Sequence, residues 1–149
     1  MRYSFVFSVL CCVCFFSFGC GDKRPDGMPK PVSCTLTVQF EDGSPVEDAN
    51  IRLIPEDSAN KWAAGGKTNA AGKLEVKTSG EYLGVIPGKY KVICTKTESI
   101  PTGQKSEEGD EMMKVNHLIH PSFSSAAKTT LTLEVQNSPV NETLVVKKP

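Results

Sequence analysis

Short runs in which apolar and polar residues alternate recur along this chain, and turn-forming residues separate them. Residues 34–40 (CTLTVQF) alternate without a fault, which is the pattern of a strand with one buried face. The same period recurs in five further runs, at residues 49–55, 73–78, 89–95, 129–136 and 142–147. Past the N-terminal segment, no run of about ten residues has the spacing of an amphipathic helix. Short strands without helices predict an all-β fold, a sandwich of two packed sheets.

Turn signals lie between the predicted strands. Asp42 and Gly43 tolerate positive φ, and Pro45 cannot extend a hydrogen-bonded ladder, so the chain is expected to reverse there. Gly72 ends a second turn, at a place where a β-branched residue would be strained. The strand boundaries therefore have local causes.

Residues 96–128 interrupt the alternation. Residues 97–110 are polar and contain Pro101, Gly103 and Gly109, which predicts a long mobile loop. Residues 111–118 fit either one helical turn or a short strand, and the sequence leaves both open.

The first nineteen residues differ from the rest of the chain. Arg2 gives a positively charged start, and residues 4–18 are uncharged and mostly apolar. A run of about fifteen residues suits the apolar core of an export signal, whereas a membrane-spanning helix needs ~20. We therefore expect residues 1–19 to be a signal peptide, with an uncleaved anchor as the alternative.

The signal ends at Gly19 and Cys20, where two cleavage routes compete. The pair resembles the end of a bacterial lipoprotein signal, in which a small residue precedes an obligatory cysteine, although Ser17 and Phe18 depart from the usual leucine and small residue. Ordinary signal cleavage favours the small residues Ser17 and Gly19 and cuts the same bond. Both routes make Cys20 the first mature residue, and we expect it to carry the lipid.

A flexible tether is expected next. Residues 20–31 hold the acylated cysteine and a stretch rich in Pro and Gly, without apolar periodicity. Residues 32–149 would form the β-sandwich domain. This organisation predicts a protein of the bacterial cell envelope, anchored to the membrane through Cys20 and facing the periplasm or the exterior.

Two cysteines remain in the mature domain, Cys34 and Cys94, each on the apolar parity of its predicted strand. Export to an oxidising compartment permits a disulfide between them. Closing a loop of about sixty residues would stabilise the fold by ~3–4 kcal/mol. The alternative is two buried free thiols that pack as small apolar residues.

Several phrases, taken in order, resemble the carboxypeptidase regulatory-like domain of small bacterial lipoproteins. They are residues 32–36 (VSCTL), 42–49 (DGSPVEDA), 51–55 (IRLIP), 68–74 (TNAAGKL) and 86–92 (IPGKYKV). The resemblance covers about residues 32–147. It implies a Greek-key sandwich of about seven strands, of the immunoglobulin or transthyretin type. Asn69 stands where the family usually has Asp, Cys34 where it often has Gly, and Cys94 where it often has Val.

Composition argues against several kinds of partner. Lys and Arg together number 17, as do Asp and Glu, so no net field draws the chain to nucleic acid. Aromatic residues make up only 7% and do not alternate with basic ones as a base-stacking surface would. We expect a monomer without a nucleic-acid partner or a cofactor; a protein or glycan partner is left open.

Residues with catalytic or metal-binding chemistry are sparse. His117 and His120 have the spacing of two metal ligands on a helix, but no third ligand follows and Pro121 would end any helix. Ser122 lies near His120 without the features of a nucleophile elbow. We therefore expect no metal site, no catalytic residue and no enzyme activity.

The only tryptophan, Trp62, lies in the predicted loop of residues 56–66. A loop Trp can stack on a sugar ring or anchor a partner, and it can also simply cover the end of a core. The expected function is a non-catalytic, lipid-anchored envelope module with a structural, adhesion or ligand-binding role. The alternative is a carbohydrate- or peptide-binding accessory domain that uses the Trp62 loop together with residues 96–128.

Overall fold

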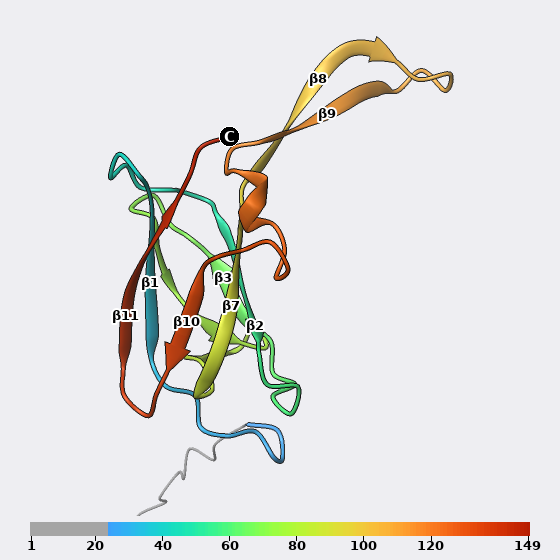
Figure 1. Ribbon diagram of the computed structural model, residues 1–149. Coiled ribbons are helices and arrows are strands. Elements are labelled where there is room, and N and C mark those ends of the chain that lie inside the picture. Colours follow the sequence, from blue (N-terminus) through green and yellow to red (C-terminus); the bar gives the residue numbers. More distant parts are fainter. Residues whose placement is uncertain (1–23) are drawn as a thin grey trace, which may run out of the picture.

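The computed structural model describes residues 24–149; the predicted signal peptide and Cys20 lie outside the described residues (Figure 1). Two sheets pack face to face, and a separate two-stranded hairpin extends from one end (Figure 1). The predicted all-β sandwich is confirmed. Within residues 24–149 the sandwich has nine strands, several of them only two to four residues long, in place of the expected seven or so.

The smaller sheet has the order β11-β1-β4. Its strands are β1 (Cys34–Phe40), β4 (Lys73–Glu75) and β11 (Val140–Val146). The first and last strands pair in parallel, from Cys34 opposite Val140 to Phe40 opposite Val146. The first and last predicted strands, far apart along the chain, therefore lie side by side.

The larger sheet has the order β10-β7-β2-β3-β5-β6, and its neighbouring strands are antiparallel. Its strands are β2 (Asn50–Pro55), β3 (Ala64–Lys67), β5 (Lys77–Thr78), β6 (Tyr82–Leu83), β7 (Gly88–Thr95) and β10 (Thr132–Val135). β2 and β7, each of which the sequence predicts as a strand, pair with each other over the whole length of β2. The short strands β3 and β6 fall in segments that lack alternation.

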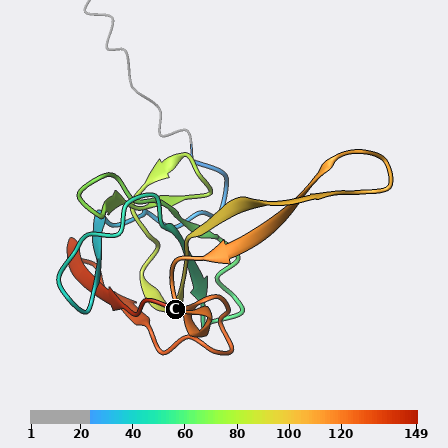
Figure 2. The ribbon, with the colours of Figure 1, turned by 90° about the horizontal axis from the view of Figure 1, so that it is seen from above.

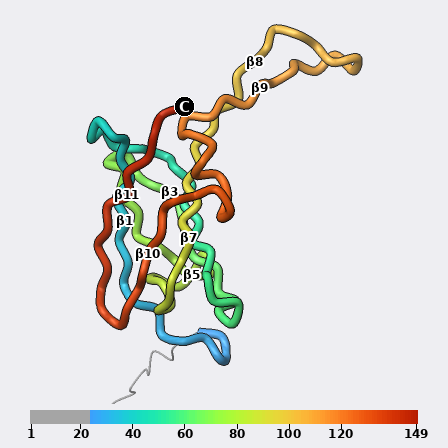
Figure 3. The backbone as a smooth tube through the Cα atoms, viewed as in Figure 1, coloured from blue at the N-terminus to red at the C-terminus, as the bar shows by residue number. Residues whose placement is uncertain are grey.

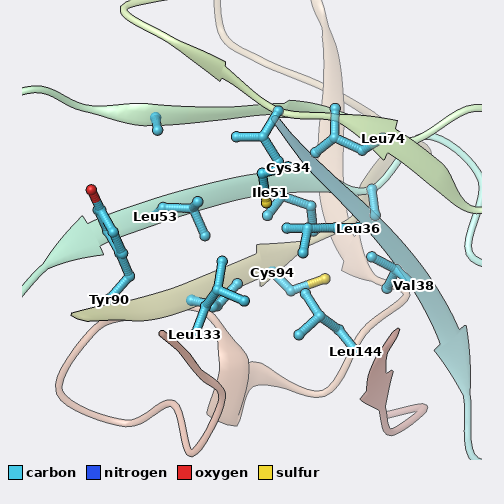
Figure 4. Packing of buried hydrophobic residues seen from close by; sticks show 14 of the residues in the cluster. Cys34, Leu36, Val38, Ile51, Leu53, Leu74, Tyr90, Cys94, Leu133 and Leu144 are labelled. Carbon is cyan, nitrogen blue, oxygen red and sulfur yellow. The ribbon is translucent and has the colours of Figure 1, made fainter. Parts of the chain in front are cut away.

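The core lies between the two sheets and is built from the predicted apolar parity (Figure 4). Leu36 and Val38 of β1 face Ile51 and Leu53 of β2, and all four side chains are fully buried. Tyr90 of β7 is buried too, and its hydroxyl donates a 2.6 Å hydrogen bond to the Ile86 carbonyl. The buried hydroxyl therefore has a partner, as burial of a polar group requires.

The run at residues 73–78 is divided between the sheets. β4 pairs with β1 of the smaller sheet, whereas β5 pairs with β3 of the larger one. Val76, between β4 and β5, is 1% exposed and its N–H bonds the Cys34 carbonyl at 3.0 Å. Continuous alternation in the sequence does not reveal that the strand changes sheets at this residue.

Part of the predicted tether packs on the domain. Met28 is only 6% exposed, and Val32 forms a bridge with Val85 through two 2.8 Å hydrogen bonds. The predicted flexible tether is therefore not free of the domain along its whole length, because Met28 packs on the sandwich.

The prediction of a mobile loop over residues 97–110 is wrong. Residues Thr97–Lys105 form β8 and Glu111–His117 form β9, an antiparallel pair with an irregularity between Pro101 and Lys105. For residues 111–118 the sequence leaves a helical turn or a short strand open, and β9 shows that the segment is a strand. The pair extends away from the sandwich in both views (Figures 1 and 2).

The described residues contain a single short 3₁₀ helix, η1 (Pro121–Phe123). No helix in residues 24–149 has the length and apolar character needed to cross a bilayer.

Candidate functional site: a projecting hairpin

The β8–β9 hairpin leaves the sandwich at the end of β7. Its base is closed by a 2.9 Å hydrogen bond from the Leu118 N–H to the Lys96 carbonyl, and its tip by a 2.8 Å bond from the Ser106 N–H to the Asp110 carbonyl. Between these points every residue of β8, and all of β9 except Asn116, is exposed. The hairpin is thus an arm held by its own ladder and fixed to the domain at its base (Figure 3).

Large apolar side chains are concentrated on this hairpin. Six are exposed within residues 24–149, and four of them are Ile100, Met112, Met113 and Val115, which are 43%, 47%, 52% and 56% exposed. Ile100 pairs with Lys114, so it shares a face with Met112, while Met113 and Val115 share the opposite face. Both faces of an otherwise solvated ribbon therefore carry apolar surface, as is typical of a contact site.

The tip of the hairpin is acidic. Glu107, Glu108, Asp110 and Glu111 lie within and beside the turn, and all are exposed. None of these four carboxylates forms an ion pair with another residue of the described chain. Lys105 lies directly opposite Glu111 in the ladder and offsets part of this charge, so the tip carries net negative charge next to the apolar side chains of Met112 and Met113.

A mostly apolar cleft of about 420 Å³ lies at the base of the hairpin, lined by Phe40, Lys96, Asn116, His117, Leu118, Lys148 and Pro149. The Lys148 Nζ atom is 5.0 Å from the Phe40 ring centroid and 2.6 Å from Asp42 Oδ2. Lys148 and Ser44 hold the pKa of the Asp42 carboxyl well below its usual range. These contacts join the hairpin end of the sandwich to the β1–β2 turn.

Trp62 lies at the other end of the sandwich. It is half-buried in the loop before β3, and the Lys61 Nζ atom lies 5.7 Å from its ring centroid. The Asn60 side chain holds this loop, since it donates to the Tyr90 hydroxyl at 2.9 Å and accepts from the Trp62 N–H at 3.2 Å. Because Tyr90 is near the start of β7 and the hairpin follows the end of β7, the Trp62 loop and the hairpin do not form one site (Figure 1).

The two histidines belong to different elements. His117 ends β9 opposite Thr97, whereas His120 caps η1, where its Nδ1 atom is 2.9 Å from the Ser122 hydroxyl and accepts from the Ser122 N–H at 3.2 Å. Residues 24–149 contain no group of three or more His, Cys, Asp or Glu side chains placed to hold a metal ion. The His120–Ser122 contact is an exposed capping interaction within one turn.

Cys34 and Cys94 are free, buried thiols that come from opposite sheets (Figure 4). Burial raises the pKa of the Cys34 thiol to about 11 and that of Cys94 to about 12. Both values disfavour the thiolate, which is the form that acts as a nucleophile or binds a metal ion. The sequence leaves a disulfide and two free thiols equally open, and alkylation of the unfolded chain would distinguish them.

The sequence places a possible ligand contact within residues 96–128, but it does not predict that this segment contains a hairpin. The signal available was the turn segment SEEGD at residues 106–110, which lies between two runs of similar length that contain Thr, Ile and Val. Strand alternation fails as a guide because neither face is buried, so no polar–apolar contrast marks the strands.

The comparisons with known proteins identify no family. No family model and no curated protein matches the chain. A solved structure of the major pilin subunit of Bacillus cereus aligns with a TM-score of 0.46 and 16% identity, over 81% of this chain and 31% of that one. A 9R-lipoxygenase from Cyanothece aligns at 0.41 and 11%, over 84% and 18%. The chain thus spans less than a third of either neighbour, at similarities that carry no inference about function.

Proposed function

We propose that this chain is a non-catalytic, lipid-anchored β-sandwich module of the bacterial cell envelope, with a structural, adhesion or ligand-binding role for which the β8–β9 hairpin makes the contacts. The observation that carries the proposal is the arrangement of the two ends. The described chain enters the sandwich at one end, and the hairpin extends from the other (Figures 1 and 3).

This arrangement has a direct consequence if Cys20 bears the lipid. Only a few residues separate Cys20 from Arg24, the first described residue, so the end of the sandwich near Met28 would face the membrane. The hairpin, at the opposite end, would be held away from the bilayer, where its exposed apolar side chains meet other envelope components. A lipid anchor and a distal contact arm together suit a structural or adhesion role better than chemistry on a small substrate.

We also propose that the sandwich is of the carboxypeptidase regulatory-like kind. The phrases that resemble that family occupy structural positions here. A Cβ atom at Gly72 would lie 2.4 Å from the Val38 carbonyl oxygen, and buried Thr68 accepts from the Ala49 N–H at 2.8 Å while donating to the Val46 carbonyl at 2.6 Å. These residues support the fold and leave the contact function to the hairpin.

The test compares surface variants in cells that make the full chain. Met113→Ser with Val115→Ser removes apolar surface from one face of the hairpin. Val145→Ser removes the one exposed large apolar side chain of β11, in the sandwich, as the control (44% exposed). We expect the hairpin variant alone to lose attachment to envelope components, measured by in-cell cross-linking. Intact mass of the membrane fraction would show acyl chains on Cys20. An unmodified Cys20, or equal cross-linking in all three chains, contradicts the proposal.

A carbohydrate- or peptide-binding role of the Trp62 loop is the second candidate. It is favoured by the partly exposed indole beside the Lys61 ammonium group. Loss of glycan-array or peptide-array binding in Trp62→Ala, with Lys61→Ala retaining part of it, would favour this role over the hairpin.

A further inference from the structure

A lysine-lined cleft of about 470 Å³ lies on the side of the sandwich, where the chain passes from one sheet to the other. It runs between β3 and β4, and the nearly buried side chain of Leu74 lies in it. The absence of a side chain at Gly66 keeps it open, since a Cβ atom there would lie 2.7 Å from Leu74 Cδ1. Its size is within the range of ligand-binding clefts in proteins.

The lysines of this cleft carry charge that the described chain does not neutralise. Lys73 and Lys77 form no ion pair within residues 24–149, while Lys67 beside them contacts Asp48 at 3.0 Å. Elsewhere on the sandwich, four lysines each have a carboxylate partner: Lys89, Lys91, Lys147 and Lys148. The cleft therefore presents positive charge, only partly offset by Glu75 on its wall.

An exposed apolar side chain adjoins these lysines. Leu83 is 64% exposed, more than any other large hydrophobic residue of the described chain, and it pairs directly with Lys77 across β5 and β6. Directly opposed residues lie on the same face of a sheet, so Leu83 and Lys77 form one surface. Like the hairpin tip, this surface combines charged and apolar side chains, but the sign of the charge is opposite. The cleft has lysines beside a leucine, whereas the tip has carboxylates beside methionines.

From this match we infer that the hairpin's partner is a second copy of this chain: the acidic tip of one copy docks on the lysine cleft of the next. The inference rests on the proposed function, because it takes the hairpin to be a contact element. Glu107 and Glu108 would meet Lys73 and Lys77, and Met112 would cover Leu83. Tip and cleft are different surfaces of one chain, so the contact is head-to-tail and builds a row or a ring.

The chemistry of the two surfaces favours this occupant. A nucleic acid or another polyanion would suit the cleft alone, and a basic protein would suit the tip alone, whereas a second copy satisfies both. Exposed charge pairs contribute little each and are screened beyond ~8 Å at physiological ionic strength. The association is therefore expected to weaken steeply with salt and to need the apolar contact as well.

The first experiment uses the full-length chain, purified from membranes in a non-ionic detergent as an equal mixture of ¹⁴N- and ¹⁵N-labelled protein. A carbodiimide that joins amines directly to carboxylates is the probe. We expect mixed-isotope cross-links between Lys73 or Lys77 and the acidic tip in low salt, and roughly a tenfold loss of them in 0.5 M NaCl, because salt shortens the screening length. Absence of mixed-isotope links at these residues overturns the inference.

Charge reversal gives the second experiment. Glu107→Lys with Glu108→Lys, and Lys73→Glu with Lys77→Glu, should each abolish self-association in analytical ultracentrifugation. An equimolar mixture of the two variants should restore it, because the tip of each variant then meets a cleft of opposite charge on the other.

The matched control is Lys30→Glu with Lys128→Glu, which changes the net charge as the cleft variant does but at exposed lysines elsewhere. This control should associate like the unmodified chain. Equal loss in the control, or no recovery in the mixture, contradicts head-to-tail docking. If self-association fails this test but the hairpin still cross-links to other envelope components in cells, the proposed function stands and only the self-association is wrong.

Discussion

At the scale of single residues, the close approach of neighbouring backbones limits which glycines of this sandwich can be substituted. Gly65 of β3 lies against β2, and a Cβ atom placed there would be 2.2 Å from the Ile51 carbonyl oxygen. No rotamer change relieves a contact between a Cβ atom and a neighbouring backbone, so the strands themselves would have to separate. The adjoining position, Gly66, would meet only a leucine side chain, which can move.

Gly65→Ala is therefore expected to lower the free energy of unfolding by about 2–3 kcal/mol, through backbone strain and overpacking. Gly80→Ala is the control, because Gly80 also has positive φ (75°) but has nothing within 4 Å of an added Cβ, so only about 1 kcal/mol is expected. Urea denaturation measures both. Equal losses would show that the close approach of β3 to β2 does not matter.

The buried thiols make a second residue-scale prediction. With a folded pKa of about 11 for Cys34 and about 12 for Cys94, against 9.0 for a free thiol, ionisation favours the unfolded chain. The stabilising effect of burial is complete below pH 9 and is lost as pH rises through the folded pKa values. The free energy of unfolding should therefore fall between pH 9 and 11, by up to about 1.4 kcal/mol per pH unit for each thiol.

Urea denaturation at pH 8 and pH 10 measures this slope, and the variant with Cys34→Ala and Cys94→Ala is the control that removes it. Both thiols should also resist iodoacetamide until the chain unfolds. A disulfide would abolish the slope and leave no thiol to alkylate even after unfolding. The same experiment thus decides between the two states that the sequence leaves open.

At the scale of elements, sequence and structure agree where a strand has one buried face. β1, β2, β7 and β11 follow from alternation, because each contrasts a core side with a solvent side; Leu36 and Val38 are both fully buried. The hairpin cannot be predicted in this way, because its strands bury neither face. The change of sheet at Val76 cannot be predicted either, because alternation does not indicate which neighbouring strand a strand pairs with. The sequence therefore names residues 96–128 as a possible contact segment but not the hairpin within it, nor the exposed apolar side chains as its contact residues.

The hairpin should be removable without loss of the sandwich. Lys96 and Leu118 are joined by a 2.9 Å hydrogen bond, so replacing residues 97–117 with a two-residue Asn-Gly turn would close the base at its existing spacing. Because the strands are exposed along their length, we expect the free energy of unfolding to change by less than about 1 kcal/mol.

Thermal unfolding followed by circular dichroism measures this, with Val145→Ser as a surface control. A collapse of stability would mean that the hairpin folds with the domain as one unit. In that case its exposed side chains would have to be assigned a structural role.

At the scale of the whole molecule, the proposed anchor and the hairpin fix an orientation relative to the membrane. The loop that contains Ser58 lies at the end where the described chain enters, and Ser106 lies at the hairpin tip at the other end (Figures 1 and 3). Both side chains are exposed, so each can be replaced by cysteine and labelled while Cys34 and Cys94 stay protected in the core. A dye at residue 58 should therefore be close to the bilayer, and a dye at residue 106 far from it.

Energy transfer to a headgroup-labelled lipid in vesicles that carry the full chain tests this orientation. Transfer from the dye at residue 58 should exceed that from residue 106 several-fold. Cys20→Ala should abolish both, because an unacylated chain has nothing to hold it at the surface. Equal transfer from the two positions would mean that the domain lies flat or tumbles on its tether. The hairpin would then have no fixed distance from the bilayer and could not act as a distal contact arm.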